Sequence, residues 1–140
     1  MSWQRLDTKL YRGPLVLTRL FNPDPTSYLR GAPPFIECWA LLDTGATDSI
    51  VDSEQIARRL MLETYDTRRL AVAGRVRAEA PVHEVGIRLP EHPFPEKRIR
   101  VAGMKLPGPF WMLIGMDLIE GTRLSLECGP EGRWLRWEPL

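Results

Sequence analysis

One short segment of the chain combines residue types that could do acid–base chemistry. Residues 41–46 read Leu-Leu-Asp-Thr-Gly-Ala, and the apolar stretch from Phe35 to Leu42 predicts a strand that ends directly before Asp43. A tight turn after that strand would hold the carboxylate on rigid backbone while leaving it open to a ligand. Asp43 is therefore the candidate catalytic residue.

A second apolar segment further along the chain also ends in a glycine. Leu113 and Ile114 lead into Gly115. Together the two segments resemble the aspartic proteases of the retropepsin type, whose motifs are Asp-Thr-Gly-Ala and, later, two apolar residues followed by Gly. The resemblance covers roughly residues 35–126. It implies a mainly β fold, a single retropepsin-like β-barrel lobe with one or two short helices, closed into an active site by homodimerisation.

The resemblance gives each residue of the turn a role. Asp43 carries the catalytic carboxylate, and Thr44 would bind the backbone of a partner subunit. Gly45 would let the backbone come close to the carboxylate, and Ala46 would keep the corner small. Because alanine lacks the hydroxyl that some relatives place here, we expect activity at mildly acid to neutral pH.

The later motif is implied to form the structural wall of the site, with Leu113, Ile114 and Gly115 crossing beneath the turn. Viral relatives carry an arginine after this glycine, which pairs with an aspartate beyond the catalytic turn. Met116 and Thr47 occupy those positions here, so that pair is absent. We interpret Asp117 as a first-turn residue that suits a helix dipole, with a second intrachain carboxylate as the alternative.

The Asp-Thr-Gly motif occurs once in the chain. Hydrolysis of a peptide bond by this chemistry needs two carboxylates that share a proton, one acting as base toward water and the other as acid. A two-fold axis would supply the second Asp43. We therefore expect a homodimeric aspartic endopeptidase without a cofactor or metal, whose other partner is a peptide or protein. The alternative is a catalytically inactive module that keeps the fold for dimerisation or peptide binding.

A hairpin predicted between residues 67 and 89 is the candidate lid. Apolar residues alternate with polar ones on its second strand, which is typical of a half-buried strand. Flaps of retropepsin-like enzymes occupy this part of their chains. The candidate flap and substrate-binding residues are accordingly Val72, Ala73, Gly74, Arg75 and Asp48. A turn residue without a ligand is the alternative for Asp48.

The elements that must position these residues are mostly strands. Apolar runs predict further strands at residues 15–21, 98–102, 111–114, 122–126 and 133–137. A helix is predicted from Asp52 or Ser53 to about Leu62, with an apolar stripe that contains Ile56, Ala57, Leu60 and Met61. The strand at residues 35–42 is apolar on both parities, which predicts burial on both faces. We expect residues 134–140 and the first ten residues to form an intersubunit sheet.

Composition limits the class of protein. Thirteen prolines and eleven glycines among 140 residues suit a β-rich single domain over residues 1–140. The net charge of +1 gives no reason to expect a nucleic-acid partner. Apolar runs fall short of the roughly 20 residues that cross a bilayer, and the polar start does not resemble a signal peptide. We expect a cytoplasmic protein without membrane contact, in which Cys38 and Cys128 are buried or half-buried thiols.

Overall fold

The computed structural model of the chain describes residues 3–72 and 76–140. Its strands are β1 (Gln4–Arg5), β2 (Leu15–Phe21), β3 (Ile36–Leu42), β4 (Ile50–Asp52), β5 (Asp66–Val72), β6 (Val76–Arg88), β7 (Lys97–Met104), β8 (Met112–Ile114), β9 (Thr122–Gly129) and β10 (Gly132–Pro139). Its helices are short: a 3₁₀ turn η1 (Ser27–Arg30), a π-helical segment η2 (Ser53–Arg58) and α1 (Met116–Ile119). The predicted strands are confirmed, and several are longer than predicted.

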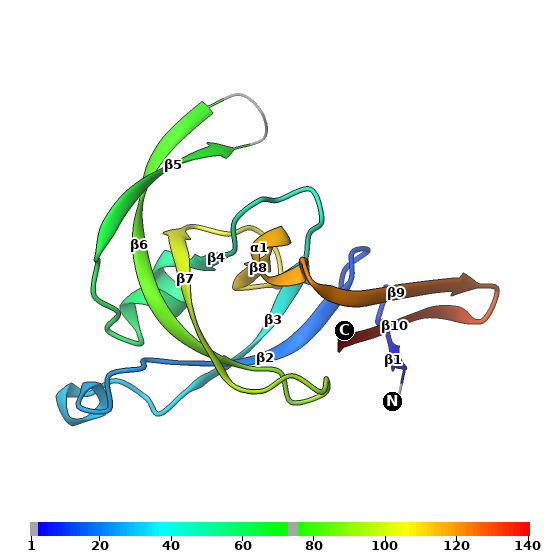
Figure 1. Cartoon of the computed structure of the whole chain (residues 1–140), viewed down its shortest axis with the longest axis horizontal. Coiled ribbons are helices and arrows are strands. Elements are labelled where there is room, and N and C mark those ends of the chain that lie inside the picture. The colour runs from blue at the N-terminus through cyan, green and yellow to red at the C-terminus, as the bar shows by residue number, and fades with distance from the viewer. Residues whose placement is uncertain (1–2, 73–75) are drawn as a thin grey trace.

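Most of the strands form a barrel. They are hydrogen-bonded in the order β2-β3-β8-β4-β7-β6-β5, and β2 also pairs with β6, so the sheet from β2 to β6 closes on itself. The strand β5 lies outside this closure and pairs with β6 as a long hairpin, which curves over one end of the barrel (Figure 1). The hairpin confirms the predicted strand pair. Its tip, residues 73–75, lies outside the described residues.

The barrel interior is filled by one face of each strand. On β3 the buried residues are Ile36, Cys38, Ala40 and Leu42, and the residues between them are exposed or half-buried. The prediction of burial on both faces is wrong for this strand. Although β2 and β8 flank it, its outer side chains are only partly covered: Glu37 is exposed, and Trp39 and Leu41 are half-buried.

The helical segment after β4 begins where the sequence predicts and ends about four residues early. Asp52 caps it, because its carboxylate accepts hydrogen bonds from the backbone of Glu54 and Gln55 at 3.0 and 2.8 Å. At its end, Met61 adopts a left-handed φ of 55°, and the N–H of Leu62 donates to the carbonyl of Ala57. This closure stops the helix, and it leaves Met61 exposed instead of in the predicted apolar stripe.

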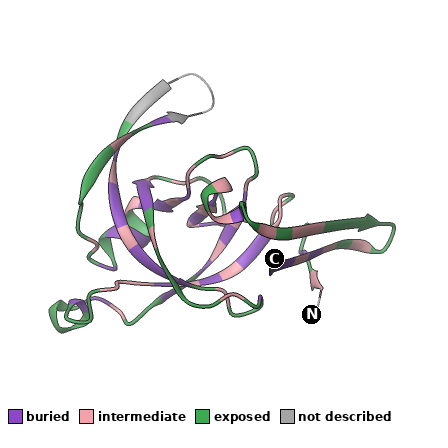
Figure 2. Cartoon of the chain, viewed as in Figure 1, coloured by how far each residue is buried: buried purple, intermediate pink, exposed green. Residues whose placement is uncertain are grey.

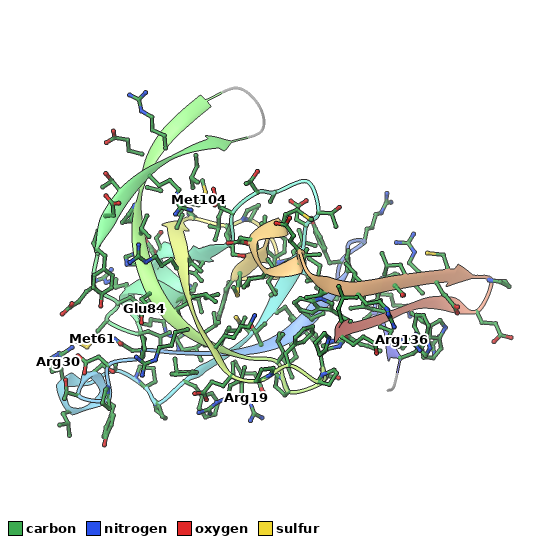
Figure 3. All side chains as sticks on the ribbon, viewed as in Figure 1. Arg19, Arg30, Met61, Glu84, Met104 and Arg136 are labelled. Carbon is green, nitrogen blue, oxygen red and sulfur yellow. The ribbon has the colours of Figure 1, made fainter. Side chains whose placement is uncertain are left out.

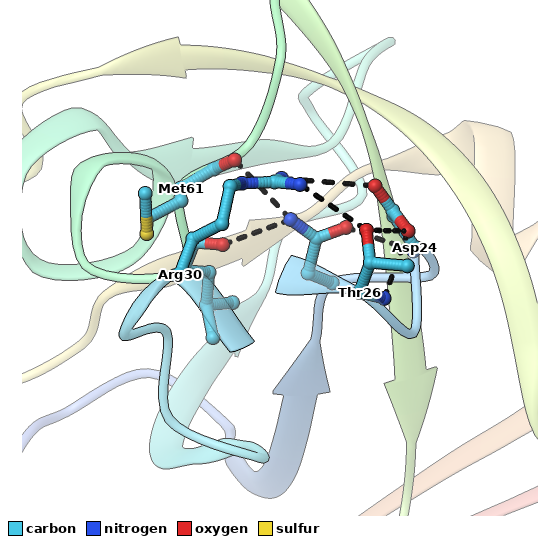
Figure 4. A network of polar contacts seen from close by, with 6 residues as sticks. Asp24, Thr26, Arg30 and Met61 are labelled. Atoms are coloured by element: carbon cyan, nitrogen blue, oxygen red, sulfur yellow. Dashed lines mark hydrogen bonds and ion pairs between the residues drawn. The ribbon is translucent and has the colours of Figure 1, made fainter. Parts of the chain in front are cut away.

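Polar contacts hold the loop between β2 and β3 against the end of the helical segment η2. The side-chain amide of Asn22 donates to the carbonyls of Leu60 and Met61, which end the helical segment (Figure 4). Asp24 accepts hydrogen bonds from the backbone and hydroxyl of Thr26, and these bonds lower the pKa of the Asp24 carboxyl. Polar groups therefore tie this loop to the end of the helical segment.

The terminal segments form a second, three-stranded sheet in the order β1-β10-β9, which we call the terminal arm. Leu135 and Trp137 of β10 are buried in the core, whereas most of β9 is exposed, and the β9–β10 hairpin projects from the barrel (Figures 1 and 2). The two termini pair with each other within one chain, through β1 and β10, and the predicted intersubunit sheet stays a prediction.

The two cysteines differ in their surroundings. Cys38 is buried on β3, and this burial raises the pKa of its thiol to about 11. Cys128 is exposed near the turn of the β9–β10 hairpin, so the prediction of a buried or half-buried thiol is wrong there. In the described part of the chain, no helix combines the length and the apolar character needed to cross a membrane.

Candidate functional site

The candidate catalytic turn, residues 43–49, begins at the end of β3. The N–H of Asp43 donates to the carbonyl of Ile114 at 2.9 Å, so the first residue of the turn is fixed to the strand beside it. The N–H of Gly45 donates to Oδ1 of Asp43, also at 2.9 Å. Asp43 is half-buried, with Thr44 and Gly45 exposed beside it and Ala46 half-buried. The carboxylate is thus oriented by backbone and remains accessible.

The strand β8 supports this turn from below. It lies parallel to β3, with Leu42 opposite Ile114, and antiparallel to β4. Gly115 follows directly, and a Cβ atom at that position would lie 2.8 Å from the carbonyl carbon of Asp48 and 2.9 Å from the carbonyl oxygen of Ala46. Only glycine allows the turn to come this close. Residues 113–115 therefore lie directly against the turn, and their role as the wall of the site stays a prediction.

A network between Ser49 and Asp117 locks the far end of the turn. The carboxylate of Asp117 accepts hydrogen bonds from the Ser49 backbone at 3.0 Å and from its hydroxyl at 2.7 Å. The same hydroxyl accepts a hydrogen bond from the N–H of Gly115 at 3.1 Å. The backbone of Met116 and Asp117 adds bonds to the carbonyls of Ala46 and Thr47.

The sequence analysis did not predict this role of Ser49. It predicted the place of Asp117 in a first helical turn but not its contact with Ser49. Asp117 does lie in the first turn of α1, as predicted. Its contact with Ser49 joins residues that are far apart in the chain, and the two share no motif. The one available signal was the absence of the viral arginine–aspartate pair, since some other group had to fix this loop.

Asp48 connects the turn to the hairpin. One of its carboxylate oxygens lies 2.7 Å from a guanidinium nitrogen of Arg68 on β5. Both side chains are partly exposed, so the pair contributes little to stability. Its geometric effect is to join the base of the predicted lid to the turn. Of the predicted flap residues, Ala73, Gly74 and Arg75 lie outside the described residues, and only the backbone of Val72 is described.

A cleft of about 650 Å³ opens beside Asp43. The turn forms one side of it, β5 contributes Arg69 and Leu70, and residues 104–107 form the opposite side. Figure 3 shows Met104 beneath the hairpin, where it packs with Ile50 against Leu70. The buried carboxylate of Asp52 accepts a hydrogen bond from the N–H of Leu106 at 2.9 Å, which fixes this side of the cleft.

A second hollow of about 620 Å³ lies against Asp43, lined by residues 8–13 and 41–43. Tyr11 is held there by an edge contact with Phe110, with ring centroids 5.3 Å apart. Asp43 therefore borders both hollows. Within the described residues, no group of three or more histidine, cysteine or acidic side chains gathers as a metal site.

The backbone resembles solved structures of retroviral-type proteases. The EIAV protease, solved with the inhibitor HBY-793, superposes with a TM-score of 0.56 at 16% identity, over 82% of this chain and 92% of that one. The chain has a retropepsin-like fold. It is mainly β and matches a single retropepsin-like lobe, as the sequence predicts.

Two further structures show weaker similarity. A retropepsin-like aspartic protease from Rickettsia conorii has a TM-score of 0.49 at 14% identity, covering 89% of this chain and 90% of that one. The retroviral protease-like domain of Ddi1 from Leishmania major has a TM-score of 0.44 at 11% identity, covering 89% and 94%. No family model and no curated protein matches the chain.

Proposed function

We propose that the chain is an aspartic endopeptidase, active as a homodimer that pairs the Asp43 carboxylates of two copies. The observation that carries this proposal is the placement of Asp43 in a retropepsin-like lobe. It lies at a strand end, is oriented by the Gly45 N–H, and borders an open cleft. One lobe holds one such turn, and the chemistry needs two carboxylates.

In the proposed reaction the two carboxylates share one proton. The ionised Asp43 takes a proton from a water, whose oxygen attacks the peptide carbonyl carbon, while the protonated Asp43 of the other copy donates to the carbonyl oxygen. The resulting diol collapses as a proton passes to the amide nitrogen, and the C–N bond breaks. No cofactor is required, because both proton transfers use carboxyl groups.

The remaining residues of the site would position the turn and the peptide. Thr44 is free to contact the second copy, because it is exposed next to Asp43. Leu113, Ile114 and Gly115 form the wall beneath the turn. An extended peptide in the cleft would lie against the apolar side chains of Ile50, Leu70 and Met104. Asp48, with Arg68, would border its path, and residues 72–75 stay a predicted lid.

We also propose that residues 1–140 form one domain that works in the cytoplasm. Support for this location comes from the two free thiols, Cys38 and Cys128. An exposed thiol such as that of Cys128 persists best in a reducing compartment.

The test is the replacement Asp43→Asn in the full chain, assayed on unfolded protein substrates and on a peptide library. We expect cleavage to fall by about 10³-fold or more, with fold and dimer unchanged. The matched control is Asp24→Asn, because Asp24 lies in the polar network of the loop between β2 and β3 and should leave cleavage intact.

Two results would contradict the proposal. Cleavage that persists in Asp43→Asn would assign the activity to another group or to a contaminant. An unmodified chain that dimerises and binds peptides without cleaving them would instead support the inactive binding module.

A further inference from the structure

The second hollow beside Asp43 carries positive charge. It is formed by the loop between β1 and β2 (blue in Figure 1) and by the end of β3. Among the residues that line it, Lys9 and Arg12 are the two cations and Asp43 is the one carboxylate. The whole chain has a net charge of only +1, so this surplus is local. Two cations thus border the same space as the candidate catalytic group.

Neither of these cations has an ionic partner within the chain as described. The side chains of Lys9 and Arg12 are exposed, and no described acidic residue forms an ion pair with them. Asp7, the nearest acidic residue in the sequence, does not line the hollow, and its Oδ1 accepts the backbone N–H of Lys9 at 3.0 Å. Both charges are therefore free to bind an anionic ligand.

The backbone that carries the two cations is fixed where it meets the terminal arm and the barrel. The guanidinium of Arg133 on β10 donates to the carbonyl of Arg12 at 2.8 Å. The N–H of Leu42, at the end of β3, donates to the carbonyl of Pro14 at 3.0 Å. A backbone held in this way positions the side chains before a ligand arrives, which reduces the entropy lost on binding.

The larger cleft on which Asp43 also borders has a different charge pattern. Asp48 lines it together with Arg69 and Lys105, so both signs of charge are present, and much of the remaining lining is apolar. An apolar or uncharged side chain suits that cleft. An anionic side chain suits the hollow, because charge complementarity selects a ligand largely by repelling the wrong charge.

We propose that the hollow binds an acidic side chain of the substrate, so that the chain cleaves peptides with a glutamate or aspartate close to the scissile bond. Lys9 and Arg12 determine this specificity by pairing with the substrate carboxylate. The inference rests on the proposed function, because it names the substrate class of the same site. A peptide whose scissile carbonyl lies at Asp43 brings its neighbouring side chains to the hollow, which begins at that residue.

The first test compares peptides that differ in one charge. Peptides with blocked ends carry Glu, Gln or Lys at one position after another near the cleaved bond, and the assay is run at about pH 6, where glutamate is ionised. We expect kcat/KM at the best position to be about fivefold or more higher for Glu than for Gln, which is the size expected of two exposed ion pairs. The ratio should fall at high salt, because salt screens exposed charges.

Variants of the two cations assign this preference to the hollow. Lys9→Met combined with Arg12→Met removes both charges, and the Glu-to-Gln ratio should fall to about one. Lys9→Glu combined with Arg12→Glu should instead prefer the Lys peptide to the Glu peptide.

The matched control is Lys97→Met combined with Arg98→Met. It removes two exposed cations from the end of β7 opposite to Met104 and the cleft, and it should leave the ratio unchanged. Each ratio compares two peptides on the same variant, so a change in folding or in the activity of Asp43 affects both and cancels.

Binding separates this inference from the proposed protease. The same peptides can be titrated calorimetrically into Asp43→Asn, which binds without cleaving. Tighter binding of the Glu peptide, lost when Lys9→Met and Arg12→Met are added, supports the hollow even where the unmodified chain cleaves nothing, and that result rejects only the protease. Cleavage without a preference for Glu, or a preference that survives the loss of both cations, overturns the inference and leaves the protease standing. A chain that neither cleaves nor binds any of the peptides overturns both.

Discussion

The candidate catalytic turn and the terminal arm are both attached to the barrel, but they are held in different ways. In the turn, the backbone of Asp43, Ala46 and Thr47 is bonded to the segment from Ile114 to Asp117. In the arm, β9 is bonded to β10 on one side and has no strand partner on its other side among the described residues. The turn therefore has more backbone support than the outer strand of the arm.

The difference lies in how firmly each region is restrained. The contacts of Gly115 and Ser49 fix the candidate turn, and a carboxylate that acts on a substrate needs such rigid support. Among the described residues, the outer edge of β9 has no strand partner that would restrain it in this way. Substitutions in the turn should therefore reduce the stability of the single chain, and the same substitutions in the arm should not.

The largest difference is expected between two glycines. Gly115→Ala would force a Cβ atom against the backbone of Asp48 and Ala46, which cannot move aside as a flexible side chain would. We expect the free energy of unfolding to fall by about 3 kcal/mol. Gly129→Ala, at the end of β9, adds a Cβ atom with no neighbour within 4 Å and should change stability by less than about 0.5 kcal/mol. Urea denaturation of both variants measures the contrast, and similar losses would contradict it.

A smaller difference is expected between two serines. Ser49 is 1% exposed, and Ser49→Ala would leave the N–H of Gly115 buried without a partner. We expect a loss of about 1–3 kcal/mol. Ser125→Ala on β9 should cost less than about 0.5 kcal/mol, measured in the monomer at low protein concentration. Faster hydrogen exchange at Gly115 in Ser49→Ala alone would assign the loss to this hydroxyl. Unchanged exchange there would refute the assignment.

The sequence predicted the turn better than the arm for a physical reason. The turn depends on neighbouring residues: an apolar strand up to Leu42, then Asp43 and two small residues. The prediction that Leu113 and Gly115 support the turn came from a second local motif, two apolar residues followed by glycine. The site residues themselves stay predictions until Asp43 is tested.

Long-range pairing was the part that the sequence did not predict. Gln4 pairs with Leu135 almost a full chain length away, and a short polar strand such as β1 carries no pattern that names its partner. The contact of Ser49 with Asp117 could not be predicted either, because no sequence pattern links these two distant residues. Cys128 shows a related error, because a small apolar residue is usually buried and a hairpin that leaves the barrel overrides that preference.

The smallest effect is expected at the joint between the arm and the barrel, where stability should depend on pH. Nε2 of His92 lies 2.8 Å from the side-chain oxygen of Gln4 on β1, and the amide of Gln4 donates to the carbonyl of Leu15 on β2. Burial lowers the pKa of His92, and Glu91 and the backbone of Trp137 oppose this only in part. The folded chain therefore holds His92 neutral at a pH where the unfolded chain protonates it.

The direction in which stability changes with pH follows from this order of protonation. Stability from neutral His92 is complete above the unfolded pKa of about 6.5 and is lost as the pH falls through the lower folded pKa. We expect His92→Gln to reduce the loss of unfolding free energy between pH 7.5 and pH 5. Asp24→Asn should not change that loss, because the lowered pKa of Asp24 affects stability only below its unfolded value of 3.8. An equal loss of unfolding free energy between pH 7.5 and pH 5 in the His92 variant and in the unmodified chain would show that this joint does not sense pH.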